Sequence, residues 1–172
     1  HWREHPGSTA VGMGVKSYAL EAGQRAVEEH LARAGLDATV GANTRGYFEV
    51  EYRLPEPQPS VAIIIPTRNQ LSFLKTCIET IRRHTTYGNY RIWVVDNESD
   101  CPDTLSWLEQ ERLSGRLELL QGEGAFNFSR LNNYAVNQVD SDFVLLLNND
   151  IEVVSGDWLS DMVATACQSD VG

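Results

Sequence analysis

Five apolar residues, Val61-Ala-Ile-Ile-Ile65, run without a polar interruption and are followed at once by Pro66-Thr-Arg-Asn69. A run of this length, rich in β-branched residues, is typical of a strand that is buried on both faces. Such a strand belongs to a parallel sheet covered by helices, and ligands of these sheets bind beyond the carboxyl ends of the strands. The polar residues after Ile65 are therefore the first candidates for a functional site.

The sequence after this strand alternates between helix and strand patterns. Apolar residues recur at helical spacing from Leu71 to Ile81, and a strand pattern returns at 91–95. Further helices are predicted at about 102–113, 129–139 and 157–168, and further strands at 117–120 and 143–147. This repetition predicts an α/β fold, a mostly parallel sheet with helices on both faces.

Three of these helices have a predicted apolar face or N-cap at particular residues. Leu105, Leu108 and Leu113 form the apolar face predicted for the helix that begins at Pro102. Ser129 and Asp157 are the N-caps predicted for the last two helices, because short polar side chains favour that position.

Residues 1–57 differ from the rest in pattern. Helical spacing at 18–34 predicts one amphipathic helix, and alternation of apolar and charged residues at 47–54 predicts an edge strand. Three prolines between 55 and 59 remove backbone donors and favour an extended linker. We therefore predict a helix-plus-strand segment with a Pro-rich linker at 1–57, followed by an α/β domain at 58–172.

Composition excludes several partners. Among 172 residues, 24 acidic side chains outnumber 14 basic ones, and the net charge of -10 disfavours nucleic acid and anionic lipid as primary partners. No apolar run reaches the length of about 18 residues that a transmembrane segment needs. The three cysteines lack C-x-x-C spacing and are predicted to be free thiols in a reducing compartment. The chain begins with His1, so we expect it to be cut from a longer protein.

Polar clusters follow three of the predicted strands. They are Pro66-Thr-Arg-Asn69, Asp96-Asn-Glu-Ser-Asp100 and Asn148-Asn-Asp150. The carboxyl ends of parallel strands meet at one edge of a sheet, so we expect the clusters to share a rim. The chain has neither the G-x-G-x-x-G turn nor the G-x-x-x-x-G-K-[ST] loop, which disfavours classical NAD binding and P-loop chemistry.

The third cluster has the chemistry of a metal site. Asn148, Asn149 and Asp150 offer two amide oxygens and one carboxylate, which are hard ligands suited to Mg²⁺ or Mn²⁺. One protein carboxylate is enough where water and substrate phosphates complete the coordination shell. The alternative is a polar turn after a strand, without a ligand.

The first two clusters fit a nucleoside. The Asp96 carboxylate can accept a hydrogen bond from a nucleobase imide or a ribose hydroxyl, and its alternative is an Asx turn. Thr67 and Asn69 are expected to hold the same nucleoside. Arg68 is either a phosphate contact or a solvated side chain.

A further group lies at the entry of the helix at 129–139. Phe126 and Phe128 are expected in the core, which is where aromatic side chains are more often found. Asn133, on the same helix, is a further candidate ligand contact.

Four segments, taken in order, closely resemble family 2 glycosyltransferases. They are residues 61–69, 92–99, 128–134 and 146–150, and the resemblance extends over 58–172. It implies the nucleotide-binding half of a Rossmann-like GT-A fold. Carried over by position, Thr67 and Asp96 match nucleoside contacts, Asn149 matches the ribose side, and Asp150 matches the metal ligand.

The sequence departs from the family pattern at three positions. Glu98 and Asn127 stand where the family commonly has Gly, and Asn148 replaces the first Asp of the metal motif. The Asn-Asn-Asp version resembles the branch that includes rhamnosyltransferases of O-antigen and rhamnan synthesis. Residues 1–10 are similar to the end of one transferase module in chains that join two, which implies an inter-module segment.

The resemblance implies an inverting enzyme that moves a sugar from a nucleotide-diphosphate donor to a saccharide or lipid-linked saccharide acceptor. Its place would be bacterial surface polysaccharide synthesis, in the cytoplasm or at the membrane periphery. The catalytic base is expected beyond Gly172, so the segment alone is expected to lack turnover. A rival interpretation is a non-catalytic nucleotide-binding or assembly module.

Overall fold

The computed structural model describes residues 17–43, 46–169 and 171. The stretch 1–10, whose sequence resembles the end of a transferase module, lies outside the described residues. Contacts divide the chain into two compact units, with the division between Arg53 and Leu54.

The first unit joins one helix to a two-stranded hairpin. Helix α1 spans Ser17–Ala34, and strands β1 (Ala38–Ala42) and β2 (Phe48–Tyr52) pair antiparallel. Leu31 of α1 and Val40 of β1 are buried. The predicted helix and the predicted edge strand are confirmed. The pattern does not reveal β1, because its sequence Ala-Thr-Val-Gly-Ala contains only one apolar side chain larger than alanine.

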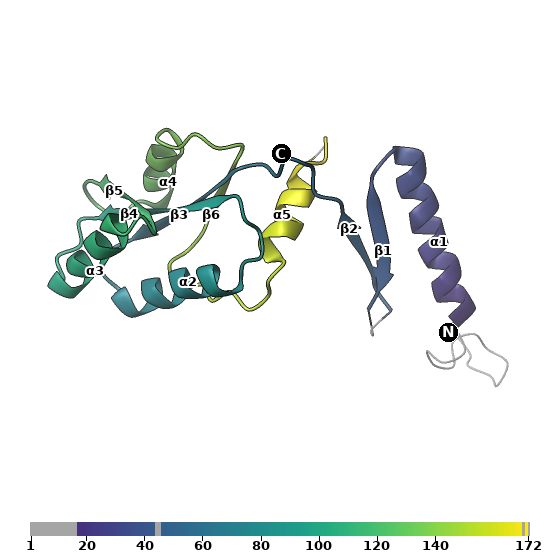
Figure 1. The fold of residues 1–172 in the computed structure, drawn as a ribbon, viewed down its shortest axis with the longest axis horizontal. Helices are drawn as coiled ribbons and strands as arrows, with labels where there is room; N and C mark the ends of the chain where they lie inside the picture. Colours follow the sequence, from purple (N-terminus) through teal and green to yellow (C-terminus); the bar gives the residue numbers. More distant parts are fainter. Residues whose placement is uncertain (1–16, 44–45, 170, 172) are drawn as a thin grey trace, which may run out of the picture. The chain divides into compact units, whose positions relative to one another are not determined.

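The second unit is built on a parallel four-stranded sheet (Figure 1). Its strands are β3 (Val61–Thr67), β4 (Tyr90–Asn97), β5 (Glu118–Gly122) and β6 (Phe143–Leu146), in the spatial order β5-β4-β3-β6. Every residue of β3 is buried. The predicted α/β fold with a parallel sheet is confirmed.

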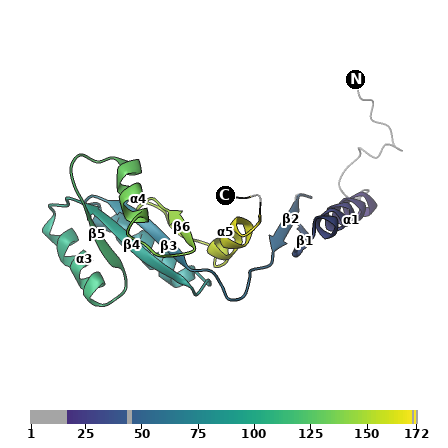
Figure 2. The ribbon, with the colours of Figure 1, turned by 90° about the horizontal axis from the view of Figure 1, so that it is seen from above.

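Helices cover both faces of this sheet. They are α2 (Leu71–His84), α3 (Pro102–Leu113), α4 (Phe128–Val136) and α5 (Trp158–Ala166). Ile63 and Ile65 pack into the larger core with α2, α3 and α5, whereas Ile64 packs with Leu131 and Ala135 of α4. Figure 1 shows α4 on one side of the sheet and α2 and α3 on the other. Figure 2 shows the same sheet from above, with α4 lying across it. Because side chains alternate along a strand, a strand covered on both sides needs a continuous apolar run.

Helix α3 buries a different face from the predicted one. Leu105 and Leu113 are 43% and 71% exposed, whereas Thr104, Leu108 and Glu111 are buried. The helix packs against β5, at the edge of the sheet, so the sheet covers only a narrow stripe of it. The predicted apolar face is therefore wrong at two of its three positions.

The caps of the last two helices also differ from the prediction. Asn127, not Ser129, is the N-cap of α4, and its side chain accepts a hydrogen bond from the Arg130 backbone N–H at 2.9 Å. Asp157 precedes α5 as predicted, but its side chain accepts from the Thr86 hydroxyl at 3.0 Å and makes no capping bond. The backbone differs as well: Asn127 is extended, as capping residues usually are, whereas Asp157 is already in the helical region with φ -91° and ψ 0°.

We expect the end of β5 to tolerate no added volume. A methyl group at Gly122 would lie 2.4 Å from Leu131 Cδ2 and 3.3 Å from Val95 Cγ1. Gly122→Ala should lower the free energy of unfolding by about 1–3 kcal/mol, measured by urea denaturation. Gly88→Ala is the control, because nothing lies within 4 Å of its methyl position. Equal denaturation midpoints for the two variants would contradict this packing.

The three cysteines are free, as predicted, and two of them should differ in reactivity. Burial raises the pKa of the Cys77 thiol to about 11, whereas hydrogen bonding from the Thr104 backbone N–H lowers the pKa of the Cys101 thiol. A lower pKa leaves more thiolate at pH 8, so Cys101 should be alkylated first and Cys77 only after unfolding. Mass spectrometry of peptides after brief iodoacetamide treatment measures the order. Faster labelling of Cys77 in the folded chain would be the contrary result.

Candidate functional site

A cavity of about 410 Å³ lies beyond the carboxyl ends of β3 and β6. It is lined by Pro66, Thr67, Arg68, Phe126, Phe128, Asn148, Asn149 and Asp150. Parallel pairing of β3 with β6 brings the two chain segments together, and the pairing continues past β6, where Leu147 N–H donates to the Ile64 carbonyl at 2.9 Å. The first and third polar clusters therefore share one rim.

Helix α2 holds the segment that follows β6. The Cys77 thiol donates to the Asn148 carbonyl at 3.6 Å. The Val153 N–H donates to the buried Thr80 hydroxyl at 3.1 Å. These two contacts, one on each side of Asp150, fix the backbone while leaving the Asp150 side chain exposed.

A side-chain hydrogen bond joins the two ends of the cavity rim. Asn149 Nδ2 donates to Thr67 Oγ1 at 3.0 Å, across 82 residues of sequence. Thr67 is buried and its hydroxyl donates in turn to the Asn69 carbonyl at 3.3 Å. Since the hydrogen bond to Thr67 uses the Asn149 Nδ2, the side-chain oxygen of Asn149 can accept a hydrogen bond from a ligand or coordinate a metal.

The donor set around Asp150 fits a divalent metal only with help from a substrate. Among the residues that the structure describes, no group of three or more His, Cys, Asp or Glu side chains converges on one point. Asp150 is the one carboxylate among the described residues that line the cavity, beside the amides of Asn148 and Asn149. Mg²⁺ and similar ions accept such a set when diphosphate oxygens and water supply the other ligands.

Asp96 lies beside Thr67, because the two residues are partners in the register of β3 and β4. Its Oδ1 accepts from the backbone N–H of Ser99 at 3.2 Å and also from the Ser99 hydroxyl. The Asp96 carboxylate thus closes a local turn, and it is not among the residues that line the cavity. Asp96 is only 2% exposed, and within the described residues its hydrogen bonds reach Oδ1 and not Oδ2.

The turn after Asp96 explains one departure from the family pattern. Glu98 has a φ of 56°, a left-handed conformation that glycine adopts without strain. Its carboxylate accepts from the Gly124 N–H at 2.9 Å, which ties the turn to the loop before α4. A glycine would adopt this backbone conformation more easily, but it could not accept the hydrogen bond from Gly124.

Asn69 joins the first two polar clusters to each other. Its side-chain oxygen accepts from the backbone N–H groups of Asp100 and Cys101 at 3.1 and 3.0 Å. Its own N–H donates to the Ser99 hydroxyl at 2.7 Å. Asn69 does not line the cavity. The link through Ser99 is a part of the site region that sequence reasoning missed, because a lone serine in a turn gives no signal.

The remaining predicted residues divide between the cavity and the surface. Arg68 lines the cavity, whereas Asn133 is exposed on α4 and does not. Phe126 and Phe128 were expected in the core, but they are 55% and 40% exposed and line the cavity. The expectation is wrong because both side chains lie beyond the end of the sheet. The smaller core, formed by Ile64, Val95, Leu131 and Ala135, does not extend that far.

No helix within the described part of the chain has the length and apolar character needed to cross a bilayer.

Relatives of known sequence match the whole chain but are much longer. An uncharacterized protein of Sinorhizobium fredii is 45% identical over 178 residues, a match that covers 99% of this chain and 19% of that protein. The O-antigen biosynthesis protein RfbC of Myxococcus xanthus is 35% identical over 173 residues and is covered over 13% of its length. The chain thus spans less than a fifth of the length of these relatives.

A solved structure shares the fold. The mannosyltransferase PcManGT from Pyrobaculum calidifontis, solved with GDP-Man and Mn²⁺, aligns with a TM-score of 0.60 at 20% identity. The alignment covers 90% of this chain and 44% of that one. The sheet order and helices described above therefore form the GT-A arrangement that the sequence predicts. The sequence model for "Glycosyl transferase family 2" matches residues 62–172, so the chain belongs to that family.

Proposed function

We propose that this chain holds the donor-binding half of an inverting glycosyltransferase, which moves a sugar from a nucleotide diphosphate to an acceptor hydroxyl. The observation that carries the proposal is the hydrogen bond from Asn149 to Thr67, which draws the segment holding Asp150 onto the end of β3. Oxygen ligands for a metal and polar groups for a nucleoside thereby share one rim.

In this proposal the diphosphate and a divalent metal bind at the third cluster. Asp150 holds Mg²⁺ or Mn²⁺, with the amide oxygens of Asn148 and Asn149 close to the metal, the diphosphate and the ribose. Arg68, exposed at the same cavity, contacts a phosphate oxygen. The metal would neutralise the diphosphate, which otherwise meets a chain of net charge -10.

The nucleoside in this proposal lies against the ends of β3 and β4. Thr67 and the free oxygen of Asp96 hold the ribose or the base, and they are adjacent in register. Asn69 orders the turn that contains Asp100, and a direct contact with the nucleoside stays a prediction. Asn133 also stays a predicted donor contact.

Transfer with inversion requires a base that takes the proton from the acceptor hydroxyl as the bond to the leaving diphosphate breaks. Asp150 is the only carboxylate among the described residues lining the cavity, and metal binding occupies it. We therefore assign the base to none of the described residues that line the cavity, and its position beyond Gly172 stays a prediction. On this ground we expect the segment alone to bind donor without turnover.

The biological role follows the O-antigen biosynthesis relative, RfbC. We propose synthesis of a cell-surface polysaccharide in the cytoplasm or at the membrane periphery, with a saccharide or lipid-linked saccharide as acceptor. The division into residues 1–57 and 58–172, the former linking two modules, is part of the same proposal.

A second candidate function is a non-catalytic nucleotide-binding or assembly module. The single carboxylate among the described lining residues favours it, since a recognition site needs no metal. The two candidates differ in metal dependence, because a transferase donor site needs Mg²⁺ or Mn²⁺ for tight diphosphate binding and a recognition module does not.

The first test concerns Asp150. Asp150→Asn removes the charge that holds the metal, so the gain in GDP or UDP affinity on adding Mn²⁺ should fall from at least about tenfold to less than about twofold. Isothermal titration with and without Mn²⁺ measures this gain. Glu152→Gln is the matched control, because it removes one exposed carboxylate two residues away. A Mn²⁺ effect that persists in Asp150→Asn would show that the metal binds elsewhere.

The second test concerns Asp96. Asp96→Asn keeps an oxygen to accept from Ser99 but weakens bonds to ribose or base, so nucleoside diphosphate affinity should fall by about tenfold. The exposed Asp140→Asn, at the other end of β6, controls for the change in net charge. Circular dichroism should report an intact fold for both variants. Unchanged affinity in the folded Asp96→Asn variant would restrict Asp96 to closing its turn.

A further inference from the structure

Most of the basic side chains of residues 58–172 lie at the end of the sheet away from the donor cavity. Residues 58–172 hold eight basic side chains against sixteen acidic ones. Five of the eight belong to the last turns of α2 and α3 and to the starts of β4 and β5: Arg82, Arg83, Arg91, Arg112 and Arg116. Basic residues therefore gather at the amino ends of the strands.

A cavity of about 640 Å³ opens among these residues. Arg82, Arg91 and Arg116 line it together with Tyr90, and Gly88 and Gly115 leave its wall open because no side chain projects from them. Tyr90 begins β4 and Arg116 precedes β5, so this cavity and the donor cavity lie at opposite ends of the parallel strands.

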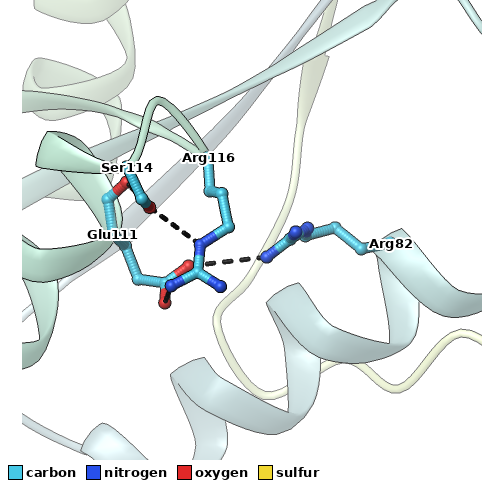
Figure 3. A network of polar contacts seen from close by, with 4 residues as sticks. All are labelled: Arg82, Glu111, Ser114 and Arg116. Carbon is cyan, nitrogen blue, oxygen red and sulfur yellow. Dashed lines mark hydrogen bonds and ion pairs between the residues drawn. The ribbon is translucent and has the colours of Figure 1, made fainter.

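One buried carboxylate orients two of the arginines. Glu111 Oε1 accepts from Arg116 at 2.6 Å, and its Oε2 lies 3.5 Å from Arg82 Nη1. The Ser114 hydroxyl accepts from Arg116 Nε at 2.8 Å. Figure 3 shows both guanidinium groups converging on Glu111, one from α2 and one from the turn after α3. The positive charges are thus held in place before any ligand arrives.

Structural roles account for only part of this arrangement. Basic residues stabilise the C-terminal turns of helices, which explains Arg82, Arg83 and Arg112. Arg91 and Arg116 lie outside the helices. Arg116 alone pairs closely with Glu111, and Arg91 makes no hydrogen bond or ion pair with the residues described. A guanidinium has five N–H donors, and Arg82 and Arg116 use only one and two of them within the described residues.

We propose that this basic cavity binds a phosphate group of a ligand distinct from the sugar donor. Each guanidinium can bind two oxygens side by side, so two guanidinium groups on separate elements can together engage three or more oxygens of one phosphate. A carboxylate fits less well, because it has only two oxygens for the two forks. The phosphate belongs either to a soluble phosphorylated compound or to a lipid headgroup.

Tyr90 adds a neutral donor. Burial raises the pKa of its hydroxyl, so the hydroxyl stays protonated at neutral pH and can donate to a phosphate oxygen. Glu118 also lines the cavity. Arg112 lies near enough to Glu118 for their charges to interact, which offsets the repulsion between this carboxylate and an anion.

The experiment titrates the 172-residue chain with inorganic phosphate, with EDTA present to exclude metal from Asp150. The amide signals of Gly88 and Gly115 should shift saturably in NMR spectra, with a dissociation constant of about 1 mM or below, while Gly124 at the other end stays unshifted. Arg82→Gln leaves the close Arg116–Glu111 pair intact and should weaken binding at least about fivefold. Arg83→Gln, one residue away and outside the cavity lining, should change it less than about twofold.

Two further arms complete the test. Arg91→Gln removes a side chain with no described partner, so a loss of phosphate binding in this variant cannot come from breaking the Glu111 network. Flotation with phosphatidylcholine vesicles, with and without phosphatidic acid, identifies the source: recruitment that depends on Arg82 assigns a headgroup, and its absence beside saturable phosphate binding assigns a soluble compound. No saturable shift of Gly88 and Gly115 up to about 10 mM phosphate, or equal losses in Arg82→Gln and Arg83→Gln, would overturn the proposal.

Discussion

The parallel pairing of β3 with both β4 and β6 is the constraint on which the rest of the second unit depends. A strand buried along its whole length must satisfy its backbone groups with a neighbour on each side, since no water reaches them. Pairing with β4 sets Thr67 beside Asp96, and pairing with β6 carries Asp150 to the same rim. The hydrogen bond from Asn149 to Thr67 then locks an arrangement that the ladder has already brought together.

The two ends of the sheet differ in the sign of the charge that surrounds them. At the carboxyl ends, polar loops meet an acidic surface, so an anionic donor can bind well there only if a cation neutralises it. At the amino ends of the strands, the last turns of helices α2 and α3 contain arginines, and the buried Glu111 pairs with two guanidinium groups. One unit thus holds two regions of opposite character, separated by the length of the strands.

Much of this architecture could be predicted from the sequence, because it follows from the period of the apolar residues. The buried run at Val61 predicted both a central strand and the rim where Thr67 and Asp150 meet. Periodicity could not predict which face of α3 is buried. Glu111 is a charged residue, and it is buried because it pairs with Arg82 and Arg116, which come from other parts of the sequence. It could not predict the exposure of Phe126, which depends on where the loop before α4 leaves the core. Nor could it predict that Asn69 would bridge two loops, because its partners Asp100 and Cys101 lie 31 and 32 residues away in the sequence.

A metal held by Asp150 and a nucleoside held beside Thr67 should occupy one site. A crystal structure of the chain grown with Mn²⁺ and GDP or UDP would show whether they do. We expect Mn²⁺ at about 2.1 Å from an Asp150 carboxylate oxygen, with diphosphate oxygens completing its shell and the nucleoside against Thr67 and Asp96. A nucleotide bound at full occupancy elsewhere, or in this cavity with the metal away from Asp150, would contradict this expectation.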